Sequence, residues 1–387
     1  MKAAAKATNA LAVVFLLVTS VTALGEEKGR FSVNPTSKHG GKWRIAYFEA
    51  GEYVDYQQIL TETVRGLMKL KWIEPTDVPR QEGEQTKQLW EWLSTKAESE
   101  YLEFVQDAHY TANWDEKLAN EVAASLLTRL QTKNDIDLLI AMGTWAGKAF
   151  ANNRHSTPVL VLSASDALAS GIIKSVADSG FEHVHATVDP KKFERQVRVF
   201  EEIVKFKKLG VAYEDTPNGR SYAAIDMLER LKKERGFELV PCYTKSDIAD
   251  TREAEQTVIR CFEEFAGNVD AIYVTQQGGV TRRSIPTLVA IANKHRIPTF
   301  SQSGSEEVKY GFLASLSQAG FRYVGEFEAQ TLAKVFNGAK PGELTQLFEE
   351  PPKIALNLRT AEIIRLDPPV LLIGAADEIY QDITNPE

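Results

Sequence analysis

Residues 137–150 read Asp-Leu-Leu-Ile-Ala-Met-Gly-Thr-Trp-Ala-Gly-Lys-Ala-Phe and join a short apolar run to a helix-like segment. The run from Leu138 to Met142 is continuously apolar, which is typical of a parallel strand buried on both faces. Gly143 ends the strand, and the helix that follows offers free backbone N–H groups and a positive dipole end, with Thr144 as a short polar cap. Because open α/β sheets bind ligands at the carboxyl ends of their strands, this pattern predicts a small anion site.

The same strand-to-helix construction recurs along the chain, in units of about 25 to 30 residues, the size of a βα repeat. The expected strands span residues 43–49, 102–111, 138–142, 158–165, 209–213, 237–243, 271–275, 297–301, 311–317 and 353–358. Alternation of this kind predicts an α/β fold with parallel sheets and helices on both faces. The pattern restarts near residue 185, so we expect two Rossmann-like lobes rather than one long sheet.

The length, composition and net charge of the 387-residue chain limit the class of protein it can be. The chain is too long to fold around one ordinary hydrophobic core, and its length fits two domains with an additional segment. A hydrophobic content of 43% and a charged content of 25% are those of a soluble globular protein. The net charge of −8 gives no support to nucleic-acid binding, which usually shows a basic stripe. Cys242 and Cys261 are either a disulfide or two buried free thiols, and the sequence leaves both open.

The first 25 residues have the features of a cleaved signal peptide. Lys2 and Lys6 precede an apolar run over residues 10–18, and small residues near Ala23 offer cleavage sites. The run is shorter than the ~20 residues that a spanning helix needs, which disfavours the alternative of an uncleaved anchor. We therefore expect an exported, periplasmic protein.

Catalytic, cofactor and metal motifs find little support. Three residues separate Gly143 from Gly147 and Ala149 follows Lys148, so the nucleotide-loop pattern is not met, and we expect no cofactor. No Gly-x-Ser-x-Gly elbow occurs, and we expect no enzyme. His183 and His185 are either two metal ligands or part of a polar crossing between lobes, and the lack of further ligands favours the crossing.

Polar or aromatic residues that follow the expected strands are the candidates for ligand contacts. They are Glu49, Tyr53, Gly143, Thr144, Trp145, Ser163, Ser165, Tyr213, Asn218, Gln276, Gln302 and Ser303. Gly143, Thr144 and the two serines of the first lobe would donate hydrogen bonds to a carboxylate. Trp145 would either offer a ring face to an apolar ligand or pack inside the lobe. Glu49 could receive a ligand cation.

Several stretches together resemble periplasmic ABC-transporter substrate-binding proteins of the tryptophan/tyrosine-binding type, over roughly residues 43–382. They are residues 137–144, 157–166 with Ser170-Gly171, 209–213, 270–275, 296–301 with Gly311, and 336–341. The resemblance implies the type I periplasmic-binding-protein fold, with lobe crossings near 185–189, 314–319 and 343–353. The implied lobes comprise residues 43–185 plus 316–343 and residues 186–315 plus 344–382.

The resemblance also implies a function. A monomer would capture a small organic ligand, such as an aromatic or other amino acid or a related carboxylate, and deliver it to an ABC permease in the inner membrane. The alternatives are a ligand sensor acting on a receptor kinase or chemoreceptor, and an exported enzyme. The family often carries acids where this chain has Gln276 and Gln302. We therefore expect carboxylates without an amine to bind at least as well as amino acids.

The helix expected over residues 84–101 is an addition to the family pattern. It carries Trp90 and Trp92, which point to different faces because they are two residues apart. They form either a lid or docking surface, or satellite packing on the first lobe, which we favour.

Overall fold

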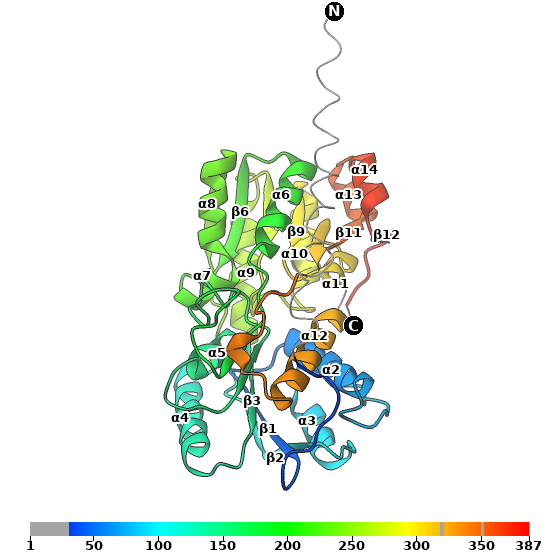
Figure 1. Ribbon diagram of the computed structural model, residues 1–387. Coiled ribbons are helices and arrows are strands. Elements are labelled where there is room, and N and C mark those ends of the chain that lie inside the picture. Colours follow the sequence, from blue (N-terminus) through cyan, green and yellow to red (C-terminus); the bar gives the residue numbers. More distant parts are fainter. Residues whose placement is uncertain (1–30, 318–320, 350–351, 387) are drawn as a thin grey trace, which may run out of the picture.

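The computed structural model describes residues 31–317, 321–349 and 352–386, and these residues build two sheets (Figure 1). The first sheet has the order β2-β1-β3-β4-β5, and all its neighbouring strands are parallel. Its strands are β1 (Trp43–Glu49), β2 (Leu102–Tyr110), β3 (Leu138–Met142), β4 (Val159–Leu162) and β5 (Val184–Ala186). In this order the sheet reverses direction of winding between β1 and β3, which is where such sheets bind ligands.

The second sheet has the order β12-β11-β10-β9-β8-β6-β7. Its strands are β6 (Lys208–Tyr213), β7 (Glu238–Tyr243), β8 (Ala271–Val274), β9 (Thr299–Ser301), β10 (Ala314–Ser317), β11 (Lys353–Asn357) and β12 (Glu378–Tyr380). The part β7-β6-β8-β9-β10 repeats the order of the first sheet. The prediction of two similar α/β halves is therefore confirmed.

The chain passes between the two sheets three times: after β5, after β10 and before β11. The second sheet keeps β10 to its end at Ser317, beyond the boundary at residue 316 that the sequence suggested. β10 and β11 pair antiparallel, unlike the parallel pairs expected throughout. The reason is geometric. The chain leaves the second sheet at the carboxyl end of β10 and re-enters it at that same end of the strands, so β11 must run in the opposite direction to β10.

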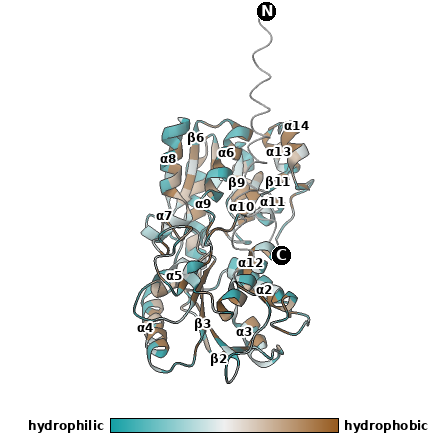
Figure 2. Ribbon diagram, viewed as in Figure 1, coloured by the Kyte–Doolittle hydropathy of each residue, from teal (hydrophilic) through white to brown (hydrophobic). Residues whose placement is uncertain are grey.

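Helices cover both faces of the first sheet. One face carries α2 (Val54–Lys69), α3 (Lys87–Thr95) and α12 (Arg322–Phe336), and the other carries α4 (Glu116–Thr132) and α5 (Gly143–Phe150). α12 enters from the second crossing and packs tightly on α2. A Cβ added at Gly325 would lie 2.4 Å from the backbone of Glu62, so this approach requires glycine. Hydrophobic residues concentrate on the strands and the inner helix faces (Figure 2).

The second sheet is covered in the same way. One face carries α6 (Lys192–Val204), α8 (Ile225–Arg235), α13 (Leu358–Ile364) and α14 (Val370–Ala375), and the other carries α9 (Thr251–Phe265) and α10 (Ile285–His295). Shorter pieces are α7 (Pro217–Tyr222), α11 (Ser305–Lys309) and the 3-10 turn η1 (Pro341–Glu343). A disulfide joins Cys242 on β7 to Cys261 on α9, which decides between the two possibilities left open by the sequence.

Two local expectations are corrected. α3 spans only Lys87–Thr95, and its Trp90 is fully buried with its indole N–H donating to the Val105 carbonyl at 3.0 Å, whereas Trp92 is half-buried. This arrangement is packing on the first lobe. Thr144 is not the cap of α5: Met142 occupies the N-cap position without a side-chain hydrogen bond, because the helix already begins at Gly143.

Among residues 31–317, 321–349 and 352–386, no helix combines the length and the apolar character that crossing a bilayer requires. The expected signal peptide over residues 1–25 lies outside the described residues.

Candidate functional site

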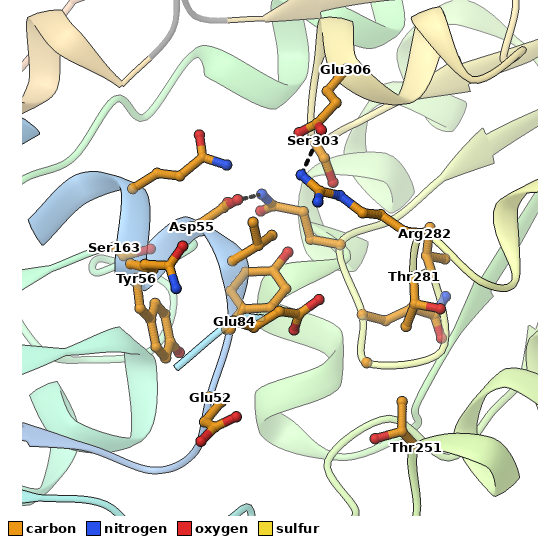
Figure 3. Close-up of a pocket in the computed structure, with 18 of the residues that line it drawn as sticks. Glu52, Asp55, Tyr56, Glu84, Ser163, Thr251, Thr281, Arg282, Ser303 and Glu306 are labelled. Atoms are coloured by element: carbon orange, nitrogen blue, oxygen red, sulfur yellow. Dashed lines mark hydrogen bonds and ion pairs between the residues drawn. The ribbon is translucent and has the colours of Figure 1, made fainter. Parts of the chain in front are cut away.

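A cleft with a volume of about 1470 Å³ lies between the two lobes. The first lobe contributes the start of α2, residues 78–84, Trp114, the start of α5 and the segment after β4. The second lobe contributes residues from the segments after β7, β8 and β9. Figure 3 shows side chains of both lobes pointing into this space. The cleft is thus lined by carboxyl ends of strands from both sheets, as the sequence predicted for the site in general.

The structure brings seven of the twelve candidate residues to the wall of the cleft. They are Tyr53, Thr144, Trp145, Ser163, Ser165, Gln276 and Ser303. The other five do not line it. They are Glu49, Gly143, Tyr213, Asn218 and Gln302.

Gln302 is fully buried, and its side-chain amide forms hydrogen bonds inside the second lobe. Its Oε1 accepts a hydrogen bond from the backbone N–H of Gln276 at 2.7 Å, and its Nε2 donates to the Tyr222 carbonyl at 2.7 Å. Gln302 therefore positions the segment that carries Gln276. Asn218 contacts the first lobe instead, and its Oδ1 accepts a hydrogen bond from Lys148 Nζ at 3.1 Å.

Tyr213 and Glu49 are also used within their own lobes. Tyr213 is buried, and its ring packs edge-on against Tyr243 with centroids 5.5 Å apart. Glu49 is buried, and its Oε2 accepts hydrogen bonds from the Tyr47 hydroxyl at 2.6 Å and from the Thr86 hydroxyl at 3.0 Å. Burial raises the pKa of Glu49 to about 7 despite these donors. This carboxyl ties β1 to the start of α3 rather than facing the cleft.

Gly143 is covered by Tyr56. It has a φ of +86°, and a Cβ at this position would lie 2.0 Å from the Tyr56 hydroxyl oxygen. The phenol therefore sits over the start of α5, where the sequence predicted an anion. Thr144, one residue further on, still lines the cleft, and its hydroxyl makes no hydrogen bond to another described residue.

Aromatic rings form one side of the cleft. The ring of Tyr53 packs edge-on against Tyr56 at 5.4 Å, Tyr56 lies 6.2 Å from Trp114, and Trp114 packs edge-on against Trp145 at 6.1 Å. Trp114 is fixed by its indole N–H, which donates to the Glu52 carbonyl at 3.0 Å. The hydroxyl groups of Tyr53 and Tyr56 have no hydrogen-bond partner among the described residues. This wall can hold a flat apolar group and still offer hydroxyl donors.

Carboxyl groups from both lobes face the same cleft. Burial raises the pKa of Asp55 to about 6 and the pKa of Asp247 and Glu307 to about 7. Asp55, in the first turn of α2, accepts a hydrogen bond across the cleft from Gln276 Nε2 at 3.2 Å. Asp247 accepts from the Tyr222 hydroxyl. These three carboxyls are partly buried and have no ion-pair partner among the described residues, so they favour a bound cation, which would return their pKa values toward the ordinary range.

Serine hydroxyl groups complete the first-lobe wall. Ser163 follows β4 with a φ of +59°, an uncommon conformation for a residue with a side chain, and such strain is frequent at binding sites. The hydroxyls of Ser163 and Ser165 make no hydrogen bonds to other described residues, so they remain available to a ligand.

Sequence reasoning missed Asp55, Tyr56, Trp114, Asp247 and Glu307. Asp55 and Tyr56 follow β1 by only a few residues, and Asp247 follows β7 in the same way. The rule that strand ends carry the site would have found these three had it been applied to each whole loop and the first helical turn. Trp114 gave no signal, because an aromatic residue before a helix is usually packing.

The two histidines are held by backbone carbonyls. His183 Nε2 lies 3.0 Å from the Asn152 oxygen, and His185 Nε2 lies 2.9 Å from the Thr345 oxygen. In the described part of the chain, no three His, Cys, Asp or Glu side chains are grouped as metal ligands.

The repeated sheet order and the cleft between the lobes define a binding protein with the type I periplasmic-binding-protein fold. The chain belongs to the family described as ABC transporter substrate binding protein, whose profile matches residues 102–377. The resemblance of the sequence to ABC-transporter substrate-binding proteins is therefore confirmed.

Individual relatives are distant. A tyrosine-binding protein of Clostridioides difficile is 24% identical over 230 residues, which cover 59% of this chain and 63% of that protein, less than two thirds of its length. An ABC domain from Streptococcus pneumoniae, solved in complex with L-Trp, superposes with a TM-score of 0.63 at 17% identity over 88% of this chain and 100% of that chain. The ligand-free, open structure of a substrate-binding protein with adhesive properties from Clostridium difficile gives a TM-score of 0.58 at 18% identity, with coverage of 88% and 100%. These structures share the fold with this chain.

Proposed function

We propose that the protein captures an aromatic amino acid between its lobes and delivers it to an ABC permease. The observation that carries this proposal is the composition of the cleft, where an aromatic wall, free hydroxyl donors and partly buried carboxyls line the same cavity. An aromatic amino acid carries the three complementary groups: a ring, a carboxylate and an ammonium. The tyrosine-binding protein and the ABC domain solved with L-Trp support the same ligand class.

Each group of the ligand has a partner of suitable chemistry. The hydroxyls of Thr144, Ser163 and Ser165 donate to the carboxylate, as expected from the sequence. Asp55 and Asp247 accept hydrogen bonds from the ammonium, one from each lobe. These two acids supply the negative charge that Gln276 and Gln302 lack. In place of the expectation that carboxylates without an amine bind at least as well as amino acids, we therefore propose a preference for the amine.

The cleft volume of about 1470 Å³ exceeds the ~300 to 1,000 Å³ of typical ligand pockets. The lobes therefore close further around a ligand of amino-acid size, by bending at the three crossing segments. Closure is driven only by contacts that the ligand makes with both lobes at once, which Asp55 and Asp247 provide. In this proposal the protein is exported, releases the ligand chemically unchanged, and meets a permease and an ATPase that are separate chains.

Calorimetry with the purified protein tests the ligand class. We expect L-Trp or L-Tyr to bind, and their deaminated analogues to bind at least tenfold more weakly. Asp247→Asn should weaken amino-acid binding ten- to hundredfold, the loss of about 1.5 to 3 kcal/mol that is typical of a charged hydrogen bond. Glu229→Gln, which removes an acid from the outer side of α8, is the matched control and should leave the dissociation constant for the amino acid unchanged.

The analogue series also tests the assigned role. Because the deaminated analogue has no ammonium, Asp247→Asn should not weaken its binding further. Equal loss for amino acid and analogue would contradict the assignment of Asp247. A lack of binding by every aromatic amino acid, together with a different compound found by mass spectrometry of the purified protein, would refute the ligand class.

A further inference from the structure

Glu328 of α12 is a carboxyl group that the binding site does not use. It is fully buried, with an exposed fraction of 0%. Its Oε1 accepts a hydrogen bond from the hydroxyl of Thr187, and its Oε2 is buried without any hydrogen-bond partner. A buried polar atom without a partner costs about 1–3 kcal/mol, so its position calls for a physical explanation.

The group lies where the lobes are joined. Thr187 directly follows β5 and begins the first crossing. The first and third crossings run side by side here, since Val188 N–H donates to the Gln346 carbonyl at 2.8 Å and Phe348 N–H donates to the Val188 carbonyl at 3.1 Å. α12 contacts the first crossing through the hydrogen bond from Thr187 to Glu328, and the third through Phe327, whose ring lies 5.0 Å from that of Phe348. Glu328 therefore touches the hinge itself.

No charged partner neutralises Glu328. It makes no ion pair with the described residues, and burial raises its pKa to about 8, against the lowering effect of the Thr187 hydroxyl. The titratable ring on the neighbouring strand is His185, fully buried, with Nδ1 unpartnered and a pKa that burial lowers to about 4. Lys334, further along α12, acts on His185 in the same direction. At neutral pH both groups are uncharged, which is compatible with their burial.

We propose that Glu328 is a hinge-control residue: its neutral acid form stabilises the lobe arrangement of this structure, and loss of its proton favours a different lobe angle in which the crossing segments separate from α12 and admit water. A carboxylate in the present position would carry a full charge with one hydrogen bond, a costly state. Bending at the hinge is the motion that changes the contact between Thr187 and α12. The equilibrium between lobe angles is therefore linked to one proton.

The sign of the linkage follows from the burial. The structure's lobe arrangement binds the proton more tightly than the hydrated one does, so its population falls as the pH rises through the pKa of Glu328. The shift toward the other arrangement is up to tenfold per pH unit between the ordinary pKa of a hydrated carboxyl and the raised pKa of Glu328, and it is complete above the raised pKa.

Interlobe distance measured on the ligand-free full-length protein tests this proposal separately from the ligand assignment. Spin labels at Lys117 on α4 and Lys233 on α8, two exposed positions, report the lobe angle by double electron–electron resonance with the native disulfide intact. The distance distribution of the wild type should change between pH 6.5 and pH 9. Glu328→Gln mimics the neutral acid and should keep the low-pH distribution throughout.

Two further variants keep the test decisive. Glu326→Gln, on the same helix but on the surface and paired with Lys69, should retain the wild-type pH response. Thr187→Val removes the hydroxyl that favours the charged form, so the midpoint of the response should move to higher pH, and this variant decides the matter if Glu328→Gln does not fold. A wild-type distribution that is constant with pH, an unaltered response in Glu328→Gln, or an unmoved midpoint in Thr187→Val would overturn the proposal.

Discussion

Replacing Gly143 by alanine should destabilise the protein strongly, for two reasons that the structure separates. The residue has a φ of +86°, which costs an L-residue about 1–2 kcal/mol. The added Cβ would also lie 2.0 Å from the Tyr56 oxygen and 2.6 Å from its Cζ, so a buried ring must move. Overpacking of this kind costs about 1–3 kcal/mol. We expect a total loss of about 2–5 kcal/mol in the free energy of unfolding.

Gly171 is the matched control for Gly143→Ala. Its φ is +73°, but a Cβ there would meet nothing within 4 Å, so Gly171→Ala carries the conformational cost alone. Urea unfolding followed by circular dichroism measures both variants. The difference between them isolates the contact with Tyr56, and Tyr56→Phe in the Gly143→Ala background should recover part of it, because the nearest atom is then gone. Equal losses for the two glycine variants would refute the reasoning that the ring of Tyr56 is fixed over α5.

Three other outcomes are expected. The pKa of Glu49 is raised to about 7, so the folded state holds this proton more tightly than the unfolded chain does, and the free energy of unfolding should fall as the pH rises from about 4.5 to 7; Glu49→Gln should remove up to about 3 kcal/mol of that fall in urea titrations. Reduction of the Cys242–Cys261 disulfide, whose cysteines are 19 residues apart, should lower the unfolding free energy by about 3 kcal/mol, and an unchanged melting temperature in dithiothreitol would contradict it. Trp90→Ala should lower the free energy of unfolding by about 3–5 kcal/mol and Trp92→Ala by much less. The reverse order would show that the buried face of α3 is assigned wrongly.

The positions of the site residues show how far strand-end reasoning reaches. It placed Thr144, Ser163, Ser165 and Gln276 on the cleft wall because parallel strands deliver their carboxyl ends to one edge. It did not reveal that the Gln302 amide is hydrogen-bonded inside the second lobe and does not reach the cleft. That outcome depends on the Tyr222 carbonyl, 80 residues away in the chain, and no local pattern encodes such a partner.

The sequence by itself determined the α/β class, the two matched halves and the edge of each sheet that carries the site, since these follow from the period of apolar residues and from glycine at strand ends. Only the tertiary structure decided which polar groups remain free. Tyr56 covers the start of α5, and Asp55 meets Gln276, 221 residues away, across the cleft. Periodicity records which face a side chain takes, whereas its partner is set by how distant segments pack.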